Sequence, residues 1–244
     1  MLKLDRYRKN LVNEGITVEQ QEKLITSKVL VMGAGSLGSG VIMNLAAFGV
    51  GQIKIVDSDV LKEDDFNRQL IHRYKNLGRA KVISAKEWIQ DYNPHIKVEI
   101  DKIRINELNY FNIIHDYDII VDCFDNYEAK YMLNEIAIRH NKILVHGGLQ
   151  GNCGQVTTIV PQKTGCLSCV VQKPKTFKEN NYAILSPIAG VISSLQAQEV
   201  LKIITGAGEP LLNKVLIYDG MKSEFRTLAF SKNLACESCS VSLF

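Results

Sequence analysis

Hydrophobic residues in the first 146 positions form short continuous runs separated by longer amphipathic segments. The run at 28–33 suits a strand buried on both faces, and a helix is predicted from the glycines after it to about Phe48. A second buried strand is predicted at 52–57. Helices are then predicted at 79–92 and 127–140, and strands at 96–100, 118–122 and 143–145. This repetition of βαβ units predicts an α/β fold with a doubly wound, mostly parallel, Rossmann-like sheet.

The pattern changes after residue 146. A glycine-rich loop that contains Cys153 is predicted first, followed by a β-rich run at 155–160 and a polar, mobile connection at 172–186. A long helix is predicted at 187–205, ended by Gly206. Two strands follow, at 214–219 and 224–230. We expect these last strands to form an additional antiparallel portion at the C-terminal side of the sheet.

The composition excludes several classes of protein. Charged residues make up 23% and hydrophobic residues 46% of the 244 positions, which is typical of a globular chain and excludes a wholly disordered one. The net charge of +3 gives no argument for binding nucleic acid. The first ten residues are charged throughout, unlike a signal peptide, and no apolar stretch approaches the ~18 residues of a membrane span. A cytoplasmic, reducing location without a membrane or nucleic-acid partner is therefore expected.

A phosphate-binding loop is predicted between the first strand and the first long helix. Gly33, Gly35 and Gly38 form G-x-G-x-x-G, which allows a tight turn and lets backbone N–H groups approach a phosphate at a helix N-terminus. Asp57 ends the next strand, where its carboxylate suits ribose hydroxyls. The alternative is a turn that only packs helix against sheet. Taken alone, the motif favours NAD over other nucleotides.

Charged residues near other strand ends change that preference. Ligands of such sheets bind outside the carboxyl ends of the strands, where Asp57, Asp122 and Asp125 are expected to lie. Arg68 and Lys81 follow the second strand closely. Carboxylates with an arginine and a lysine suit a magnesium-bound nucleoside triphosphate, whereas hydride transfer needs no such cations. The alternative is that both cations are solvated surface residues.

Short motifs recur in a fixed order over almost the whole chain. They are RY at 6–7, GxGxxG at 33–38, the acid at 57, NRQ at 67–69, GxxK at 78–81, NP at 93–94, DCxDN at 122–126, GQVT at 154–157, CxxC at 166–169, PxxGVIxSLQA from 187 and CxxC at 236–239. In this order and spacing the chain resembles the ubiquitin-activating-enzyme-like adenylyltransferases of the MoeB/ThiF/HesA group. The resemblance implies a single domain, 1–244, with an N-terminal helical segment (1–28), a nucleotide-binding core (29–146) and a remainder (147–244) that holds a crossover loop, a long helix, terminal strands and a zinc knuckle.

The resemblance also implies a reaction, which is adenylation of the C-terminal glycine carboxylate of a ubiquitin-like sulfur-carrier protein with Mg-ATP and release of pyrophosphate. By this likeness Asp57 holds the ribose, Arg68 and Lys81 contact phosphates, and Asp125 binds Mg²⁺. A homodimer is implied, with Arg68 acting across its interface, and a carrier ending in Gly-Gly. The residues assigned to ATP on this basis are Gly33, Gly35, Ser36, Gly38, Asp57, Asp59, Asn67, Gln69, Asp122 and Asn126.

Some positions depart from the family pattern. Asp65 stands where an asparagine is usual, Ser36 replaces a glycine, and Lys130 replaces an arginine. An extra carboxylate at position 65 would need a cation or a rotation away from the phosphates. Asp65 is therefore also compatible with a second hypothesis, that the protein has this fold and binds partners but does not catalyse the reaction. The sequence is also compatible with adenylation of a ribosomal peptide or another carboxylate, with an NAD-dependent oxidoreductase and with a relative that activates a tRNA carboxylate.

Four of the six cysteines form two CxxC pairs. Thiolates at Cys166, Cys169, Cys236 and Cys239 suit a tetrahedral, structural Zn²⁺, provided that the fold brings the pairs together; buried free cysteines or a redox CxxC are the alternatives. Residues 176–186 contain no cysteine, which disfavours a thioester mechanism there. Cys123 is interpreted as a packing residue, with a nucleophilic role as the alternative. Cys153 is assigned only to the glycine-rich loop, and a reactive role stays open for it. His146, at a strand end, is interpreted in the same way as Cys123, with substrate contact as the alternative.

Overall fold

The computed structural model describes residues 4–12, 15–171, 173 and 183–240. Most of the connection predicted at 172–186, including its expected mobility, lies outside the described residues. Among the described residues, no helix is long and apolar enough to cross a lipid bilayer.

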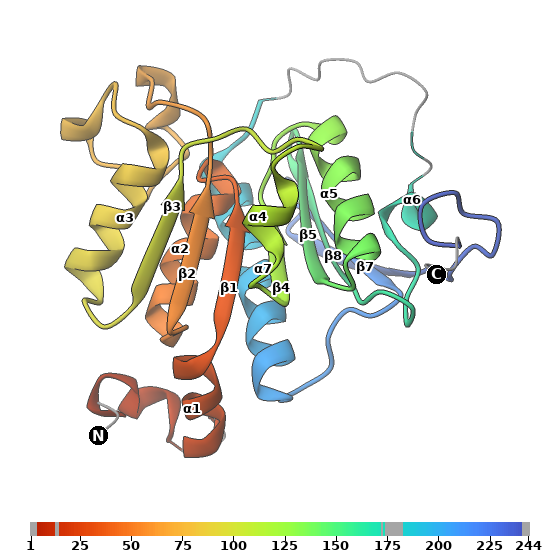
Figure 1. The fold of residues 1–244 in the computed structure, drawn as a ribbon, viewed down its shortest axis with the longest axis horizontal. Coiled ribbons are helices and arrows are strands. Elements are labelled where there is room, and N and C mark those ends of the chain that lie inside the picture. Colours follow the sequence, from red (N-terminus) through yellow and green to blue (C-terminus); the bar gives the residue numbers. More distant parts are fainter. Residues whose placement is uncertain (1–3, 13–14, 172, 174–182, 241–244) are drawn as a thin grey trace.

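Eight strands form one mixed sheet, as Figure 1 shows. Its order is β3-β2-β1-β4-β5-β6-β7-β8, with parallel pairing from β3 to β5 and antiparallel pairing from β5 to β8. The strands are β1 Lys28–Met32, β2 Gln52–Val56, β3 Lys97–Asp101, β4 Ile119–Asp122, β5 Ile143–Gln150, β6 Cys153–Ile159, β7 Lys214–Asp219 and β8 Glu224–Ala229. The predicted doubly wound sheet with an antiparallel C-terminal portion is confirmed.

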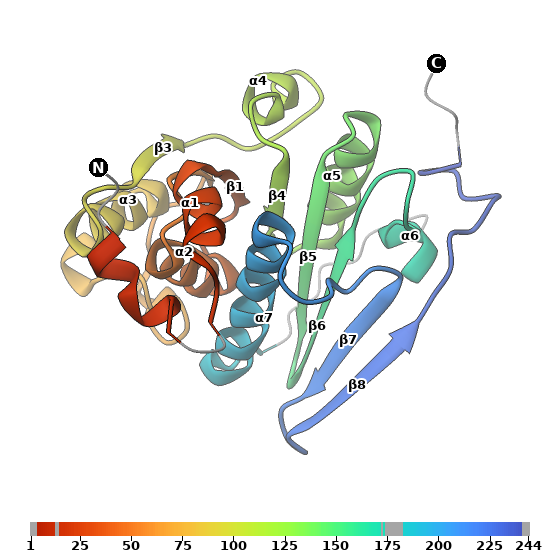
Figure 2. The same ribbon diagram turned by 90° about the horizontal axis from the view of Figure 1, so that it is seen from below.

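Helices cover both faces of the sheet. The helices are α1 Val18–Thr26, α2 Ser36–Phe48, α3 Lys81–Tyr92, α4 Tyr110–Ile114, α5 Tyr127–Arg139, α6 Leu167–Val170 and α7 Ser186–Thr205, with short 3-10 helices η1 Leu4–Asn10, η2 Glu63–Asp65 and η3 Tyr74–Asn76. Helices α1, α2, α3 and α7 pack on one face and α4, α5 and α6 on the other, so the core divides into two hydrophobic clusters (Figure 2). Helix α1 begins with a capping box, since the Thr17 side chain accepts from the Gln20 backbone and the Gln20 side chain accepts from the Thr17 backbone.

The main error of the sequence interpretation lies at the glycines after residue 146. Strand β5 continues to Gln150 instead of ending at 145, and Cys153 begins β6 instead of lying in a loop. The reason is the close approach of α7 to these strands. A Cβ on Gly147 would lie 2.3 Å from the Gln196 side chain, and one on Gly154 would lie 2.2 Å from Ile192. These glycines are therefore strand residues that make room for a helix.

Candidate active site

The glycine loop joins β1 to α2 in a conformation that requires glycine at its first position. Gly33 has φ +106°, and a Cβ there would lie 2.8 Å from the Cys123 carbonyl oxygen. A Cβ on Gly38 would lie 2.1 Å from the Gly33 carbonyl oxygen, so Gly38 serves helix–loop packing. No side chain caps α2 at Gly35, which leaves the first N–H groups of the helix available to an anion.

Asp57 is tied to the glycine loop. Its Oδ2 accepts from the Ala34 N–H at 2.8 Å, and its Oδ1 accepts from the Asp59 N–H at 2.8 Å. Burial raises the pKa of the Asp57 carboxyl, although the two backbone donors and Lys81 oppose the rise. The carboxylate thus lies beside the loop in a fixed orientation, as a ribose-binding acid requires.

The two predicted cations reach the same place from different elements. Lys81 begins α3 with its side chain only 9% exposed, and its Nζ lies 3.3 Å from Asp59 Oδ2. This burial excludes the alternative of a solvated surface lysine. Arg68 donates from Nη1 to Asn67 Oδ1 at 2.9 Å, and its side chain is 24% exposed. Arg68 lines the cavity of its own chain, so its position there needs no second subunit.

The end of β4 places the remaining acids at two depths. Asp125 and Asn126 are exposed, and Asn126 Oδ1 caps α5 by accepting from the Ala129 N–H at 2.8 Å. Asp122 is fully buried, with both carboxylate oxygens 3.2 Å from Lys130 Nζ. His146 Nδ1 donates to Asp122 Oδ2 at 2.7 Å. Asp122 and His146 therefore form a buried layer beneath the site.

This buried layer has opposing pKa shifts. Burial by itself would raise the pKa of the Asp122 carboxyl, but Lys130 and His146 outweigh it and hold that pKa below its ordinary value. Burial lowers the pKa of the His146 imidazole, and Asp122 opposes this only partly. Lys130 also donates to the Gly147 carbonyl oxygen at 2.6 Å, so it links α5 to β5.

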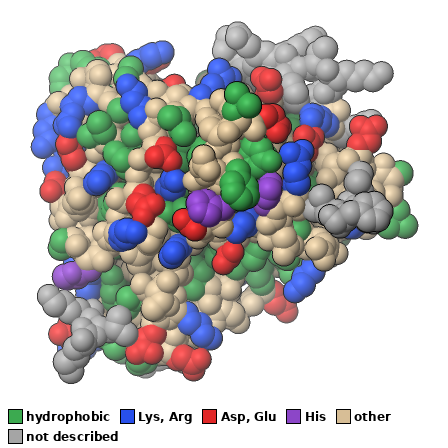
Figure 3. All heavy atoms as spheres, viewed as in Figure 1, with side chains coloured by type: hydrophobic (Ala, Val, Ile, Leu, Met, Phe, Trp, Pro, Cys, Tyr) green, Lys and Arg blue, Asp and Glu red, His purple; other side chains and the backbone are tan. Residues whose placement is uncertain are grey.

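A cavity of about 510 Å³ brings most of these groups together at the carboxyl ends of the parallel strands. The predicted site residues that line it are Gly33, Gly35, Ser36, Asp57, Asp59, Arg68, Gln69, Lys81, Asp125 and Asn126. Three predicted residues, Gly38, Asn67 and Asp122, do not line it. Cys123 does, while burial raises the pKa of its thiol well above the usual value. On the face in Figure 3, charges of both signs are interspersed.

Several lining residues escaped the sequence interpretation. Residues 103–106 follow β3 and border the cavity, and the exposed Arg104 adds a further cation to it. The rule that ligands bind beyond strand ends would have found this segment, since β3 ends at Asp101. Lys130, Leu149 and Ile184 also line the cavity, and only the tertiary fold brings them there.

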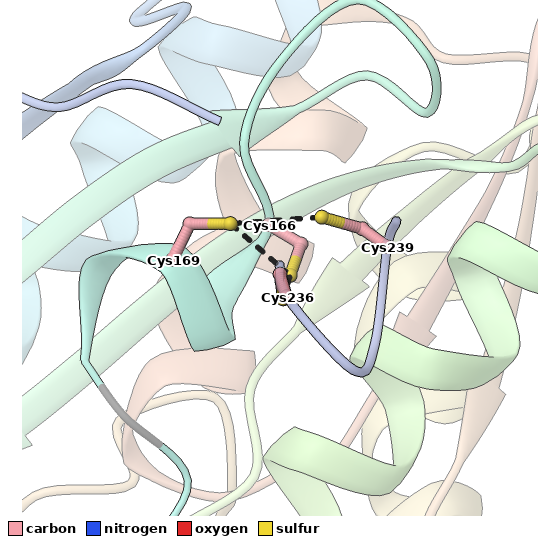
Figure 4. Close-up of side chains that lie close together, drawn as sticks. All are labelled: Cys166, Cys169, Cys236 and Cys239. Atoms are coloured by element: carbon pink, nitrogen blue, oxygen red, sulfur yellow. Dashed lines mark hydrogen bonds between the residues drawn. The ribbon is translucent and has the colours of Figure 1, made fainter. Parts of the chain in front are cut away.

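The four cysteines of the CxxC pairs form a cluster, as predicted. Their sulfur atoms lie within 4.8 Å of one another, with 3.7 Å between Cys166 and Cys236 and 3.6 Å between Cys169 and Cys239 (Figure 4). Burial, together with the neighbouring thiols Cys169 and Cys236, raises the pKa of the Cys166 thiol to about 11. Four thiolates would repel one another, so the donor set fits a divalent cation that favours sulfur.

The fold and the cavity define a class of protein: a Rossmann-like α/β protein with a glycine loop, acids and cations at one strand edge, and a separate four-cysteine cluster. The model of the ThiF family matches residues 7–240, and the chain belongs to the ThiF family.

Named relatives cover nearly the whole chain. It is 33% identical over 240 residues to a Haloferax volcanii protein named SAMP-activating enzyme E1, covering 97% of this chain and 88% of that protein. It is 31% identical over 245 residues to a Thermus thermophilus sulfur carrier protein adenylyltransferase, covering 97% of this chain and 90% of that protein. A solved structure of E. coli MccB with ATP has a TM-score of 0.82 at 26% identity, covering 91% of this chain and 68% of that one.

Proposed function

We propose that this protein is an ATP-dependent adenylyltransferase that activates the C-terminal glycine carboxylate of a ubiquitin-like sulfur-carrier protein. The observation that carries the proposal is the single cavity in which the glycine loop, Asp57, two cations and Asp125 meet. The names of the Haloferax and Thermus relatives and the ATP-bound MccB structure support it. A cavity of this volume is within the usual range for small-molecule and cofactor sites.

The proposed roles follow from where each group lies. Asp57 accepts hydrogen bonds from the ribose, and the uncapped N-terminus of α2 with Arg68 and Lys81 faces the phosphates. An oxygen of the carrier carboxylate attacks the α-phosphorus, the bond between the α-phosphorus and the bridging oxygen breaks, and pyrophosphate leaves with that electron pair. The protein aligns the two reactants, and its cations offset charge on the phosphoryl oxygens. The product is a mixed anhydride that a sulfur nucleophile attacks readily.

Asp125 fits a magnesium site. Its carboxylate is exposed at the cavity, and within the described part of the chain its one hydrogen bond comes from Asn126 Nδ2 at 3.3 Å. Oxygen ligands of this kind suit Mg²⁺, which supplies charge neutralisation of the phosphates when bound. Asp57 and Asp59 line the same cavity and add two further carboxylates to it.

The cysteine cluster is proposed to bind a structural Zn²⁺. The segment that carries Cys166 and Cys169 is fastened to α5, because Asn134 Oδ1 accepts from the Leu167 N–H at 3.0 Å and Tyr131 donates to the Val171 carbonyl at 2.8 Å. A metal held there would tie the C-terminal segment to α5. Its role is architectural, since none of the four cysteines lines the nucleotide cavity.

We further propose a cytoplasmic homodimer that acts on a carrier ending in Gly-Gly. ATP–pyrophosphate exchange tests the function. Exchange is expected only when such a carrier is added, and a carrier lacking its last glycine is the matched control. Exchange with peptides but with no carrier would favour the second candidate, adenylation of a ribosomal peptide or another carboxylate. If the protein binds ATP but shows no exchange with any carboxylate, the result would instead favour a non-catalytic protein that binds partners.

A further inference from the structure

Asp65, the acid that stands where the family pattern has an asparagine, lies beneath the cavity at the end of η2. It is 5% exposed, and its Oδ2 accepts from the Lys62 N–H at 3.0 Å. The carboxylate also contacts three cavity residues, namely Gln69, Arg68 and Lys81. The sequence left two arrangements open for this acid, a cation nearby or a rotation away from the phosphates, and the structure has the first.

The contacts with the cations place a negative charge behind the proposed phosphate-binding groups. Asp65 Oδ1 lies 3.4 Å from Arg68 Nη2, and Asp65 Oδ2 lies 3.7 Å from Lys81 Nζ. Lys81 has a second acid, Asp59, at 3.3 Å. Each phosphate oxygen that approaches these cations therefore competes with a fixed carboxylate, and the competition is stronger for a ligand with more negative charge.

The contact with Gln69 orients an amide. Gln69 is 3% exposed, and its Nε2 donates to Asp65 Oδ1 at 2.6 Å. A carboxylate only accepts hydrogen bonds, so the amide keeps its NH₂ toward Asp65. Gln69 Oε1 is consequently a buried acceptor that finds no partner among the described residues. A bare phosphate oxygen cannot satisfy an acceptor, whereas a water molecule of a magnesium hydration shell can donate to one.

Both effects act in the same direction. We infer that Asp65 makes the cavity select magnesium-bound nucleotide over metal-free nucleotide, by holding Arg68 and Lys81 against a fixed negative charge and by orienting Gln69. Metal-free ATP carries about two more negative charges than its magnesium complex, so it is repelled more. Asp65 is a specificity-determining residue that acts through its neighbours, and the inference rests on the proposed nucleotide site.

Isothermal titration calorimetry of the full chain tests this, with ATP in excess EDTA and ATP in saturating MgCl₂ at matched ionic strength. The wild type is expected to bind the magnesium form at least about tenfold more tightly. Asp65→Asn removes the charge and keeps the size of the side chain. It should reduce the ratio of the two dissociation constants, metal-free over magnesium-bound ATP, at least about threefold, mainly because metal-free ATP binds more tightly. The matched control is Asp64→Asn in the same 3-10 helix, where the exposed side chain has no ion pair within the described residues. The control should keep the wild-type ratio.

The outcomes separate the inference from the function. An unchanged ratio in a natively folded Asp65→Asn, or equal narrowing in Asp64→Asn, would refute the selective role of Asp65 while leaving the nucleotide site in place. If Asp65→Asn does not fold, the wild-type ratio decides, and a value near one refutes the inference. Failure of the wild type to bind ATP in either form would instead overturn the proposed function, and the inference with it.

Discussion

Replacing Lys130 with methionine is expected to destabilise the fold more than any exposed charge substitution on the same helix. Lys130 Nζ lies 3.2 Å from both oxygens of Asp122 and 2.6 Å from the Gly147 carbonyl, and the Lys130 side chain is 5% exposed. In the variant, the donors left to the buried Asp122 carboxylate among the described residues are His146 and the Phe124 N–H. Removing one partner of a buried ion pair costs about 3–5 kcal/mol.

Thermal unfolding followed by circular dichroism measures this cost. In a chain of this length 1 kcal/mol shifts Tm by about 2–4 °C, so Lys130→Met should lower Tm by about 6–20 °C. Arg139→Met is the matched control on α5, because Arg139 pairs with Glu107 at 3.7 Å with both side chains exposed. Its cost should stay below about 1 kcal/mol. The double variant Asp122→Asn/Lys130→Met should recover at least about 1 kcal/mol, since no charge is left uncompensated.

The pH dependence has a definite sign. In the wild type the pKa of Asp122 is lowered, so its contribution to stability is present above the ordinary carboxyl pKa and is lost as the pH falls through the lower folded value. Without Lys130, burial dominates and raises the pKa of Asp122. The loss of unfolding free energy in Lys130→Met, relative to the wild type, should therefore become smaller as the pH is lowered from 7.5 to 5.5. A variant within about 1 kcal/mol of the wild type at both pH values would contradict the assignment of a buried ion pair.

Three further predictions concern other parts of the molecule. Cys169→Ser should release zinc, measured by elemental analysis, and lower the free energy of unfolding by at least about 2 kcal/mol. The control Cys153→Ser should keep the metal. A stable Cys169→Ser variant that retains its zinc would exclude the structural role. Asp125→Ala should reduce ATP–pyrophosphate exchange at least about a hundredfold with an unchanged Tm, because the residue is exposed; retained exchange would mean that Mg²⁺ is bound elsewhere. Gly33→Ala should lower the free energy of unfolding by about 2 kcal/mol or more, because Gly33 has a positive φ and a Cβ there would lie 2.8 Å from a carbonyl oxygen. An unchanged denaturation midpoint would disprove that conformation.

The parts of the fold that follow from local periodicity could be predicted from the sequence. The run at 28–33 and the capping box at Thr17 depend on neighbouring residues alone, and both are observed. The extension of β5 through Gly147 could not be predicted, because it depends on Gln196 of α7, which is distant in sequence. In the sequence, a glycine at the end of a strand looks the same whether it forms a turn or continues the strand where a helix packs closely against it.

The candidate site divides in the same way. The strand-end rule and the motif spacing place Asp57 and Lys81 at one cavity, where the structure has them. Whether a strand-end acid faces the cavity or the layer below it depends on packing from three elements, so the burial of Asp122 against Lys130 was not foreseeable. The sequence also marks Asp65 as unusual without showing which groups it contacts.

The cysteine cluster has a consequence for how the chain is made. Cys166 and Cys236 are 70 positions apart, so α7, β7 and β8 all lie within the loop that the cluster closes. Closing a loop of that length costs on the order of 4 kcal/mol in chain entropy, which the packing of these elements and any bound metal together offset. On the ribosome the first pair of thiols emerges long before the second, and the loop stays open until β8 has been synthesised. Closure of the cluster therefore cannot precede the synthesis of β8, and a chain that stalls before Cys236 leaves Cys166 and Cys169 without their two partner thiols.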